Sequence, residues 1–359
     1  RRLLGSPRNI SMASWLAVAV LVVTITSLVI TSILSLPYGE DLAYGLSVSL
    51  LGSRASVKAD EVTRYITAMR NQTAAIAAAE GTAESVSRFA AAYKELAGTA
   101  DAAADGSEEV LADFYRDDFG PALEEALGIS VGWRTLVPTT DAGVYLQRHY
   151  VAEPDEGSEG LVDDAGDGSA WSEEHREMHL GWYELALRLG AADLYFIEPD
   201  NGNVIYSVSK RPDFATSLEV GPHSGTTLAT IMRTVRDSPE RGVVTLIDMA
   251  LYAPDVGAPM MFMASPVFDG DQLSGILVVK LSSSPIDEIM TSGGGWADEG
   301  FGDTGEVFLT NDEGRMRSVA RPFVENPSGF LADLQAAGTA TETERRAMEG
   351  VGTTAIFLK

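Results

Sequence analysis

Two histidines four positions apart, His175 and His179, are the residues of this 359-residue chain that most resemble metal ligands. In a helix this spacing places both imidazoles on one face, beside the carboxylates of Glu174 and Glu177. Zinc sites need three or four ligands, and no third ligand follows at a suitable spacing. Two packed or solvated histidines fit the pattern better, so we predict no metal site.

No other combination of residues indicates catalysis. The sequence has no phosphate-binding loop, no nucleophile elbow and no zinc-protease motif. It also has no cysteine, which excludes disulfides, thiolate catalysis and thiolate-bound metals. We therefore predict no catalytic residue and no cofactor.

A set of aromatic and acidic residues is the better candidate, for a ligand site. Polar groups inside such a site have to be paired, because an unpaired buried polar group costs about 1–3 kcal/mol. Asp248 and Tyr252 are an even number of residues apart in an apolar run, so we expect them on one strand face, where Asp248 would favour a cation. The aromatics also suit ordinary core packing, and an amine, a neutral solute or no ligand are all open. The predicted ligand-binding residues are Trp182, Tyr183, Tyr195, Tyr206, Asp248 and Tyr252.

One uncharged run decides the predicted topology. Residues Ser11 to Leu36 contain no charge, and about 20 apolar residues in a helix are enough to cross a bilayer. Trp15 and Tyr38 lie near its two ends, where interfacial aromatic residues belong. A cleavable signal peptide has a shorter apolar region, so we predict an uncleaved transmembrane helix.

Flanking charges set the predicted orientation of this helix. Arg1, Arg2 and Arg8 precede the run, and Glu40 and Asp41 follow it. Positive flanks stay in the cytoplasm, so we predict a cytoplasmic N-terminus in the cell (inner) membrane and an extracytoplasmic bulk. The net charge of −26 fits a solvated acidic exterior and excludes nucleic acid as a partner.

Beyond the run, the periodicity changes from helical to strand-like. Apolar residues recur every three or four positions in most of residues 40–135, which predicts a helical stalk. A helix over residues 171–189 and then short apolar runs follow, with one more helix at 226–237. This order predicts an α+β fold with an antiparallel five-stranded sheet of PAS type. The predicted strands are 194–198, 204–209, 243–252, 259–267 and 273–281.

A short internal repeat predicts a second module of the same kind. Phe196–Gly202 recurs without a gap as Phe308–Gly314, and each copy has the pattern of a strand, a tight turn and a second strand. Chance is the alternative, because such hairpins are common. The second copy continues with a predicted helix at 329–337 and a strand at 353–358, so we expect the chain to stop inside this module.

Several motifs together resemble the double Cache sensor domains of bacterial adenylate/guanylate cyclase receptors and chemoreceptors. The similarity runs from about residue 140 to residue 325. Amino-acid-sensing members have an arginine two positions before a Trp-Tyr pair, whereas this chain has Leu180 before Trp182 and Tyr183, so the bidentate carboxylate anchor is missing. The motifs that carry the resemblance include Val204–Lys210, Asp213-Phe214, Gly221-Pro222, Ala264–Val267 and Gly302–Glu306.

This resemblance implies the sensing region of a membrane receptor that works as a homodimer and binds an unknown small molecule. The implied output is a class III adenylate/guanylate cyclase, with a chemoreceptor, histidine kinase or protein phosphatase as the alternative. An anchored solute-binding surface protein without output is a further alternative. The implied domains are a cytoplasmic N-terminus (1–10), a transmembrane helix (11–36), the stalk (40–135), a membrane-distal Cache module (136–290) and an incomplete membrane-proximal Cache module (291–359).

Overall fold

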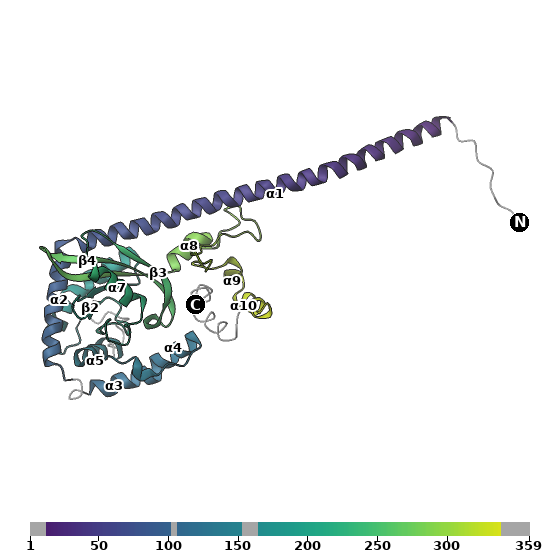
Figure 1. Cartoon of the computed structure of the whole chain (residues 1–359). Helices are drawn as coiled ribbons and strands as arrows, with labels where there is room; N and C mark the ends of the chain where they lie inside the picture. Colours follow the sequence, from purple (N-terminus) through teal and green to yellow (C-terminus); the bar gives the residue numbers. More distant parts are fainter. Residues whose placement is uncertain (1–11, 102–105, 153–163, 339–359) are drawn as a thin grey trace. The chain divides into compact units, whose positions relative to one another are not determined.

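The computed structural model describes residues 12–101, 106–152 and 164–338 (Figure 1). The chain divides into two compact units, residues 1–57 and residues 58–359, and each is described by itself. Helix α1 (Met12–Ala77) contributes to both units, because the division falls at Val57.

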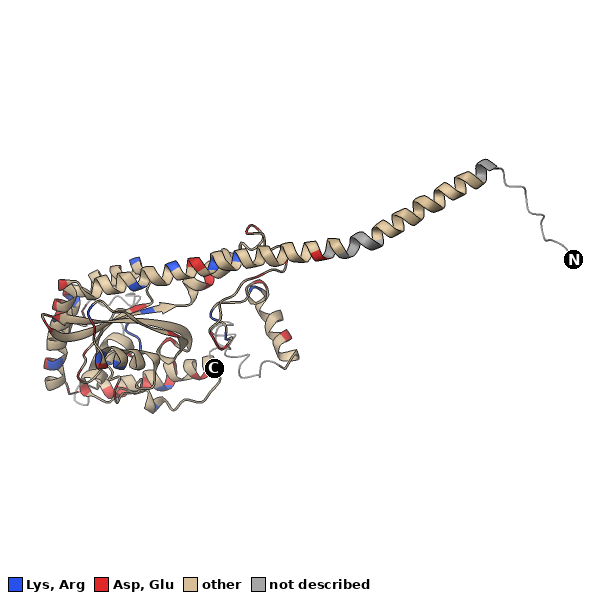
Figure 2. Cartoon of the chain, turned by 45° about the horizontal axis from the view of Figure 1, so that its top comes forward, with Lys and Arg blue, Asp and Glu red and all other residues tan. Residues whose placement is uncertain are grey.

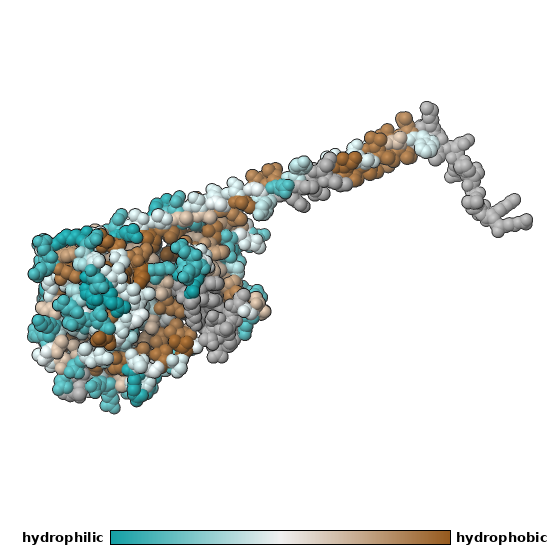
Figure 3. Space-filling model, in the orientation of Figure 1, coloured by the Kyte–Doolittle hydropathy of each residue, from teal (hydrophilic) through white to brown (hydrophobic). Residues whose placement is uncertain are grey.

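The first unit contains an apolar stretch of α1. Residues Trp15–Ser32 have a mean hydropathy of 2.2 and none of their side chains is buried. No charged residue interrupts this stretch in Figure 2, and apolar side chains dominate it in Figure 3. By length and composition this is one helix that could cross a membrane, and it lies within the predicted span.

The second unit contains one antiparallel sheet of five strands in the order β2-β1-β5-β4-β3. Nearly every position of β1, β2, β4 and β5 is buried, so both faces of the sheet are covered. The α+β class and the five predicted strands are therefore confirmed, with bounds that move by a few residues. The strands are β1 (Asp193–Ile197), β2 (Val204–Ser207), β3 (Thr245–Tyr252), β4 (Ala258–Asp269) and β5 (Gln272–Ser282).

Helices of several kinds precede and interrupt the sheet. Two segments, η1 and η3, are single π-helical turns, which often mark functional positions in helices; η1 lies within the predicted helical stalk. The elements before β1 are α2 (Glu80–Thr99), α3 (Ser107–Asp113), η1 (Phe114–Phe119), α4 (Gly120–Leu127), η2 (Trp133–Thr135), α5 (Asp141–Gln147), η3 (Arg148–Ala152) and α6 (Ala170–Leu189). Helix α7 (Thr227–Asp237) separates β2 from β3, and η4 (Ala253–Asp255) follows β3.

Helix α2, which we expected in the stalk, is part of the core around the sheet. It packs on α6 and contacts β2, β4 and β5. Figure 1 shows it beside β2 and β4. Val86 and Phe89 of α2 are fully buried, and the Phe89 ring lies 4.6 Å from the ring of Tyr206 on β2. The stalk region and the sheet therefore share one hydrophobic core.

A glycine on β5 makes this close packing possible. A Cβ at Gly275 would lie 2.5 Å from Val86 Cγ1 and 3.3 Å from the carbonyl oxygen of Ile197. We expect Gly275→Ala to lower the free energy of unfolding by about 1–3 kcal/mol, because the added methyl overpacks the contact. Urea unfolding of the full chain in detergent measures this loss. The Val86→Ala/Gly275→Ala double variant should lose less than the two single losses together, and strictly additive losses would show that α2 does not rest on β5.

After the sheet, the described chain is mainly turns and short helices. These helices are α8 (Ser284–Thr291), η5 (Ser292–Gly294), α9 (Arg321–Glu325) and α10 (Pro327–Ala336), and α10 confirms the predicted helix at 329–337. The repeat hairpin was predicted as two strands, but residues 283–338 hold only an isolated bridge between Thr310 and Met316. The predicted strand at 353–358 lies outside the described residues.

Candidate functional site

Two of the predicted ligand-binding residues meet at an aspartate that the sequence did not single out as a ligand. Tyr195 of β1 and Tyr252 of β3 both donate their hydroxyl hydrogens to Oδ2 of Asp213, at 2.8 and 2.6 Å. Asp213 lies in the segment after β2, and all three side chains are buried. Two hydroxyls from two different strands thus donate hydrogen bonds to the same carboxylate oxygen.

The other oxygen of Asp213 has no such partner. Its Oδ1 is buried and accepts no hydrogen bond from the described residues. Burial raises the pKa of this carboxyl to about 6, and the nearby Lys280 ammonium only partly opposes the rise. Asp213 is therefore a buried carboxyl that changes its charge close to neutral pH.

Next to Asp213 lies a buried ion network centred on Lys280 of β5. The Lys280 ammonium is 2.6 Å from Oδ2 of Asp255 and 3.7 Å from Oδ2 of Asp193, and its side chain is 1% exposed. Burial by itself lowers the pKa of Lys280, but Asp193, Asp255 and Asp213 outweigh burial and raise it. The lysine therefore stays charged inside the fold.

Asp193 anchors the start of β1 to the segment after β2. Its Oδ1 accepts the backbone N–H groups of Leu194, Val208 and Ser209 at 2.8, 2.8 and 3.1 Å. Its Oδ2 accepts the hydroxyls of Ser207 and Ser209. A carboxylate with so many donors is well satisfied although it is fully buried.

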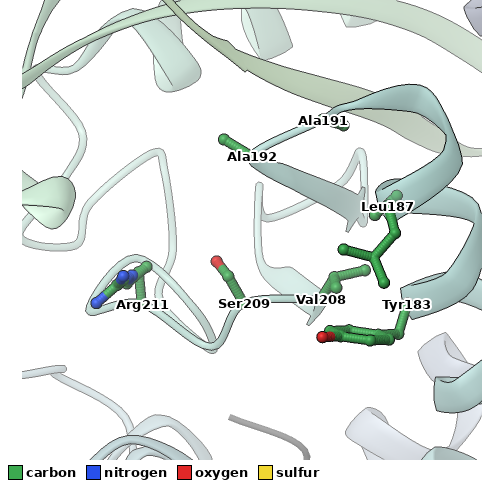
Figure 4. Close-up of a pocket in the computed structure, with 8 residues that line it drawn as sticks. Tyr183, Leu187, Ala191, Ala192, Val208, Ser209 and Arg211 are labelled. Carbon is green, nitrogen blue, oxygen red and sulfur yellow. The ribbon is translucent and has the colours of Figure 1, made fainter. Parts of the chain in front are cut away.

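A pocket of about 410 Å³ adjoins this network, which is a size typical of small-molecule sites. Figure 4 shows Tyr183 and Leu187 of α6 next to Val208, with Ser209 and Arg211 farther across the pocket. Two lining residues belong to the network: Ser209 bonds to Asp193, and Arg211 Nε lies 3.5 Å from Oδ1 of Asp255. We call this cavity the α6 pocket; its lining is completed by Ala186, Ala191 and Ala192.

The other aromatic candidates have different surroundings. Trp182 is half-buried and packs edge-on against Phe196 at a centroid distance of 4.8 Å, away from the α6 pocket that its neighbour Tyr183 lines. Tyr206 is fully buried on β2, and its hydroxyl lies 3.0 Å from Nδ1 of His179. The structure therefore brings Tyr195 and Tyr252 together, places Tyr183 in the pocket, and keeps Trp182 and Tyr206 apart from both.

Asp248 corrects one expectation. We expected it on the same strand face as Tyr252, but Asp248 is exposed and Tyr252 is buried. The pairing register of β3 with β4 shifts between Ile247 and Ala250, so one extra residue in β3 reverses the faces. The Asp248 carboxylate instead forms an ion pair with Arg317, with Nη2 2.7 Å from Oδ2 and Nε 2.9 Å from Oδ1. The cation that Asp248 favours is thus supplied by the chain itself.

The histidine pair is buried within aromatic residues. The rings of His175 and His179 stack at a centroid distance of 4.1 Å, and both side chains are fully buried. Burial, helped by the charge of Lys210, lowers the pKa of His179 to about 2, so this imidazole is neutral. Among the described residues, no group of three or more His, Asp or Glu side chains is placed to hold a metal ion.

The sequence contained a signal for the missed residues. Asp193 and Lys280 are charged residues at the edge of or within apolar strands, and buried charges of this kind are rare unless paired. Asp213 belongs to one of the motifs of the Cache resemblance, but its sequence context does not predict burial, because an aspartate in a connecting segment ordinarily faces water.

No protein-family model and no curated protein matches the chain. Among solved structures, the sensor domain of the V. cholerae histidine kinase DctB is 20% identical, covering 33% of this chain and 41% of that domain, with a TM-score of 0.26. The ligand-binding domain of the Campylobacter jejuni chemoreceptor Tlp3, in complex with 4-methylisoleucine, is 10% identical over 67% of this chain and 74% of that one, with a TM-score of 0.29. Because both TM-scores are low, function is inferred from the chain's own sheet and site.

Proposed function

We propose that this chain is the ligand-sensing region of a membrane signal-transduction receptor. The observation that carries the proposal is the α6 pocket, whose lining residues Ser209 and Arg211 contact a buried ion network built on strands β1 and β5. A pocket coupled to buried charges can change the packing of a sheet when it fills. The apolar stretch of α1 supplies the membrane anchor.

The proposed topology follows the flanking charges. The three arginines at residues 1–10 keep the N-terminus in the cytoplasm, helix 11–36 crosses the inner membrane, and the sensing modules lie outside. We propose residues 136–290 as the membrane-distal module, to which α2 of the stalk region (40–135) adds core residues, and residues 291–359 as part of a membrane-proximal module.

Signal transfer in this proposal uses the segment that follows β5. Lys280 lies near the end of β5, which is followed directly by α8 and then by Ser292. The Nζ of Lys58 on α1 donates to Oγ of Ser292 at 2.5 Å and lies 3.0 Å from Oε1 of Glu299. A shift of β5 on ligand binding would therefore reach α1 through this buried lysine.

The cytoplasmic output is proposed from the resemblance of sequence motifs alone. We propose an adenylate/guanylate cyclase output controlled by a homodimer of this region, with a chemotaxis, kinase or phosphatase output as the alternative. The chain itself has no proposed catalytic role.

Ligand binding is tested on the full chain in detergent with amino acids, short carboxylic acids and alkylamines, each scored by its effect on Tm. We expect at least one compound to raise Tm saturably, because a ligand that binds only the folded state stabilises it. Leu187→Trp, which crowds the α6 pocket, should abolish the rise, whereas Leu185→Trp, in a separate and more open pocket that Trp182 also lines, should retain it. A hit that survives Leu187→Trp would exclude this pocket as the sensing site.

The topology is tested separately by labelling single cysteines, which the cysteine-free sequence allows without background. Asp271 has a fully exposed side chain, so Asp271→Cys should react with a membrane-impermeant maleimide on spheroplasts. Ser6→Cys should react only after the membrane is permeabilised. Labelling of Ser6→Cys but not of Asp271→Cys on sealed spheroplasts would reverse the proposed orientation.

A further inference from the structure

A lysine side chain is enclosed by three aromatic rings beside the α6 pocket. The Nζ of Lys210 lies 4.6 Å from the ring centroid of Tyr206, 5.3 Å from that of Phe214 and 5.8 Å from that of Trp171. All three rings are fully buried, and Lys210 is only 6% exposed. Apart from the rings, the ammonium donates to the backbone carbonyl oxygen of Ser207. We call Trp171, Tyr206 and Phe214 the aromatic cage.

Holding the lysine in this position is costly to the fold. Lys210 has a φ of +50°, a left-handed conformation that residues with a Cβ rarely adopt. Burial lowers the pKa of its ammonium to about 7, and the attraction of Asp193 opposes this only in part. Nearby His179 is neutral, so it adds no repulsion. The attraction between the ammonium and the faces of the rings, together with the hydrogen bond to the carbonyl oxygen of Ser207, opposes these costs.

The cage and the α6 pocket share one turn of the chain. Val208, Ser209 and Arg211, the neighbours of Lys210 in sequence, all line the α6 pocket. Neither Lys210 nor a ring of the cage lines the pocket, so a ligand could reach the cage only if this turn moved and took the Lys210 side chain with it. Aromatic cages around a cation are a general means of recognising organic ammonium ions.

We propose that the aromatic cage is a binding site for an organic ammonium ion, occupied in this structure by the chain's own Lys210 and available to an external alkylammonium ligand that displaces it. The inference rests on the proposed function, because it names the class of ligand that the sensing region takes. Lys210 then acts as an internal competitor, which sets the ligand concentration needed to open the turn.

The test removes the Lys210 side chain by substitution and supplies a free alkylammonium ion in its place. Lys210→Gly takes away the side chain and also relieves the left-handed backbone, so the turn keeps its conformation. The probe is n-butylammonium chloride, which has the atoms of the lysine side chain from Cβ to Nζ. We expect it to raise the Tm of the Lys210→Gly full chain in detergent saturably by about 5 °C.

The controls separate cage binding from general salt or solvent effects. 1-Butanol, the neutral analogue, should give no rise, and wild type should respond less than Lys210→Gly at equal probe concentration because Lys210 competes. Adding Phe214→Leu to Lys210→Gly removes one ring and should weaken the response. Lys94→Ala, at an exposed lysine, should behave as wild type.

Any of three results overturns the inference. The Tm of Lys210→Gly does not change with n-butylammonium, 1-butanol raises this Tm as much as n-butylammonium does, or wild type responds as strongly as Lys210→Gly. Should Lys210→Gly not fold, Lys210→Ala with n-propylammonium makes the same test with the atoms from Cγ onward. These ammonium tests use variants that lack the Lys210 side chain. A negative result in them therefore leaves the result of the ligand panel on wild type unaffected. A panel on wild type without hits, alkylamines included, would instead remove the proposed function and with it the displacement of Lys210, whereas a response of Lys210→Gly would still show that the cage binds an ammonium ion.

Discussion

Lys280→Met is expected to lower the free energy of unfolding by about 3–5 kcal/mol, because it removes one partner of a buried ion network. The Lys280 side chain is 1% exposed, and the carboxylates of Asp193 and Asp255 are 0% and 10% exposed. Methionine fills the space of the lysine stem but leaves Asp193 without the Lys280 charge, and Asp255 keeps only the longer contact with Arg211, at 3.5 Å. Urea unfolding of the full chain in detergent, followed by circular dichroism, measures the loss.

A second substitution identifies the charge as the cause. Asp255 is the nearer partner, at 2.6 Å, so Lys280→Met/Asp255→Asn should regain part of the stability that Lys280→Met loses. Lys94→Met, at an exposed lysine, should change the free energy of unfolding by less than about 0.5 kcal/mol. If Lys280→Met lost no more than this control, the ion network would not be holding β5 to β1.

The fold could be predicted because each element has a local pattern. The turn of Pro199 to Gly202 and the apolar runs on either side of it specify a hairpin without knowledge of the rest of the chain. The extra residue in β3 has no such signal, so the faces of Asp248 and Tyr252 were assigned wrongly. Likewise, helical periodicity located α2 but could not tell whether its apolar face meets the sheet or another chain.

The candidate site was less predictable, because its residues are distant in sequence. Tyr195 and Tyr252 were predicted for their aromatic character, which is a property of single residues. Their meeting point is Asp213, 18 and 39 residues away from them, and no periodicity reports such a contact. The surroundings of Lys210 are unpredictable for the same reason, because its cage is assembled from α6, β2 and the segment that follows β2.

Asp213→Asn is expected to remove a dependence of stability on pH that wild type shows between about pH 4 and pH 6. The pKa of Asp213 is raised from 3.8 to about 6 in the folded chain, so in this range the folded state binds more protons than the unfolded state. Wild type therefore loses stability as the pH rises through this window. A shift of this size corresponds to about 3 kcal/mol, and the loss is complete above the folded pKa.

The measured quantity is the difference in the free energy of unfolding between wild type and Asp213→Asn at each pH from 4 to 8. Asparagine retains an oxygen for Tyr195 and Tyr252, and any fixed cost of its amide is the same at every pH. Other titrating groups cancel in the difference, and Asp271→Asn, at a fully exposed side chain, should give a flat line. If the difference instead favoured wild type more strongly as the pH rose, the pKa of Asp213 would be lower in the folded chain than in the unfolded chain. The attraction of Lys280 would then outweigh the cost of burying the Asp213 carboxylate.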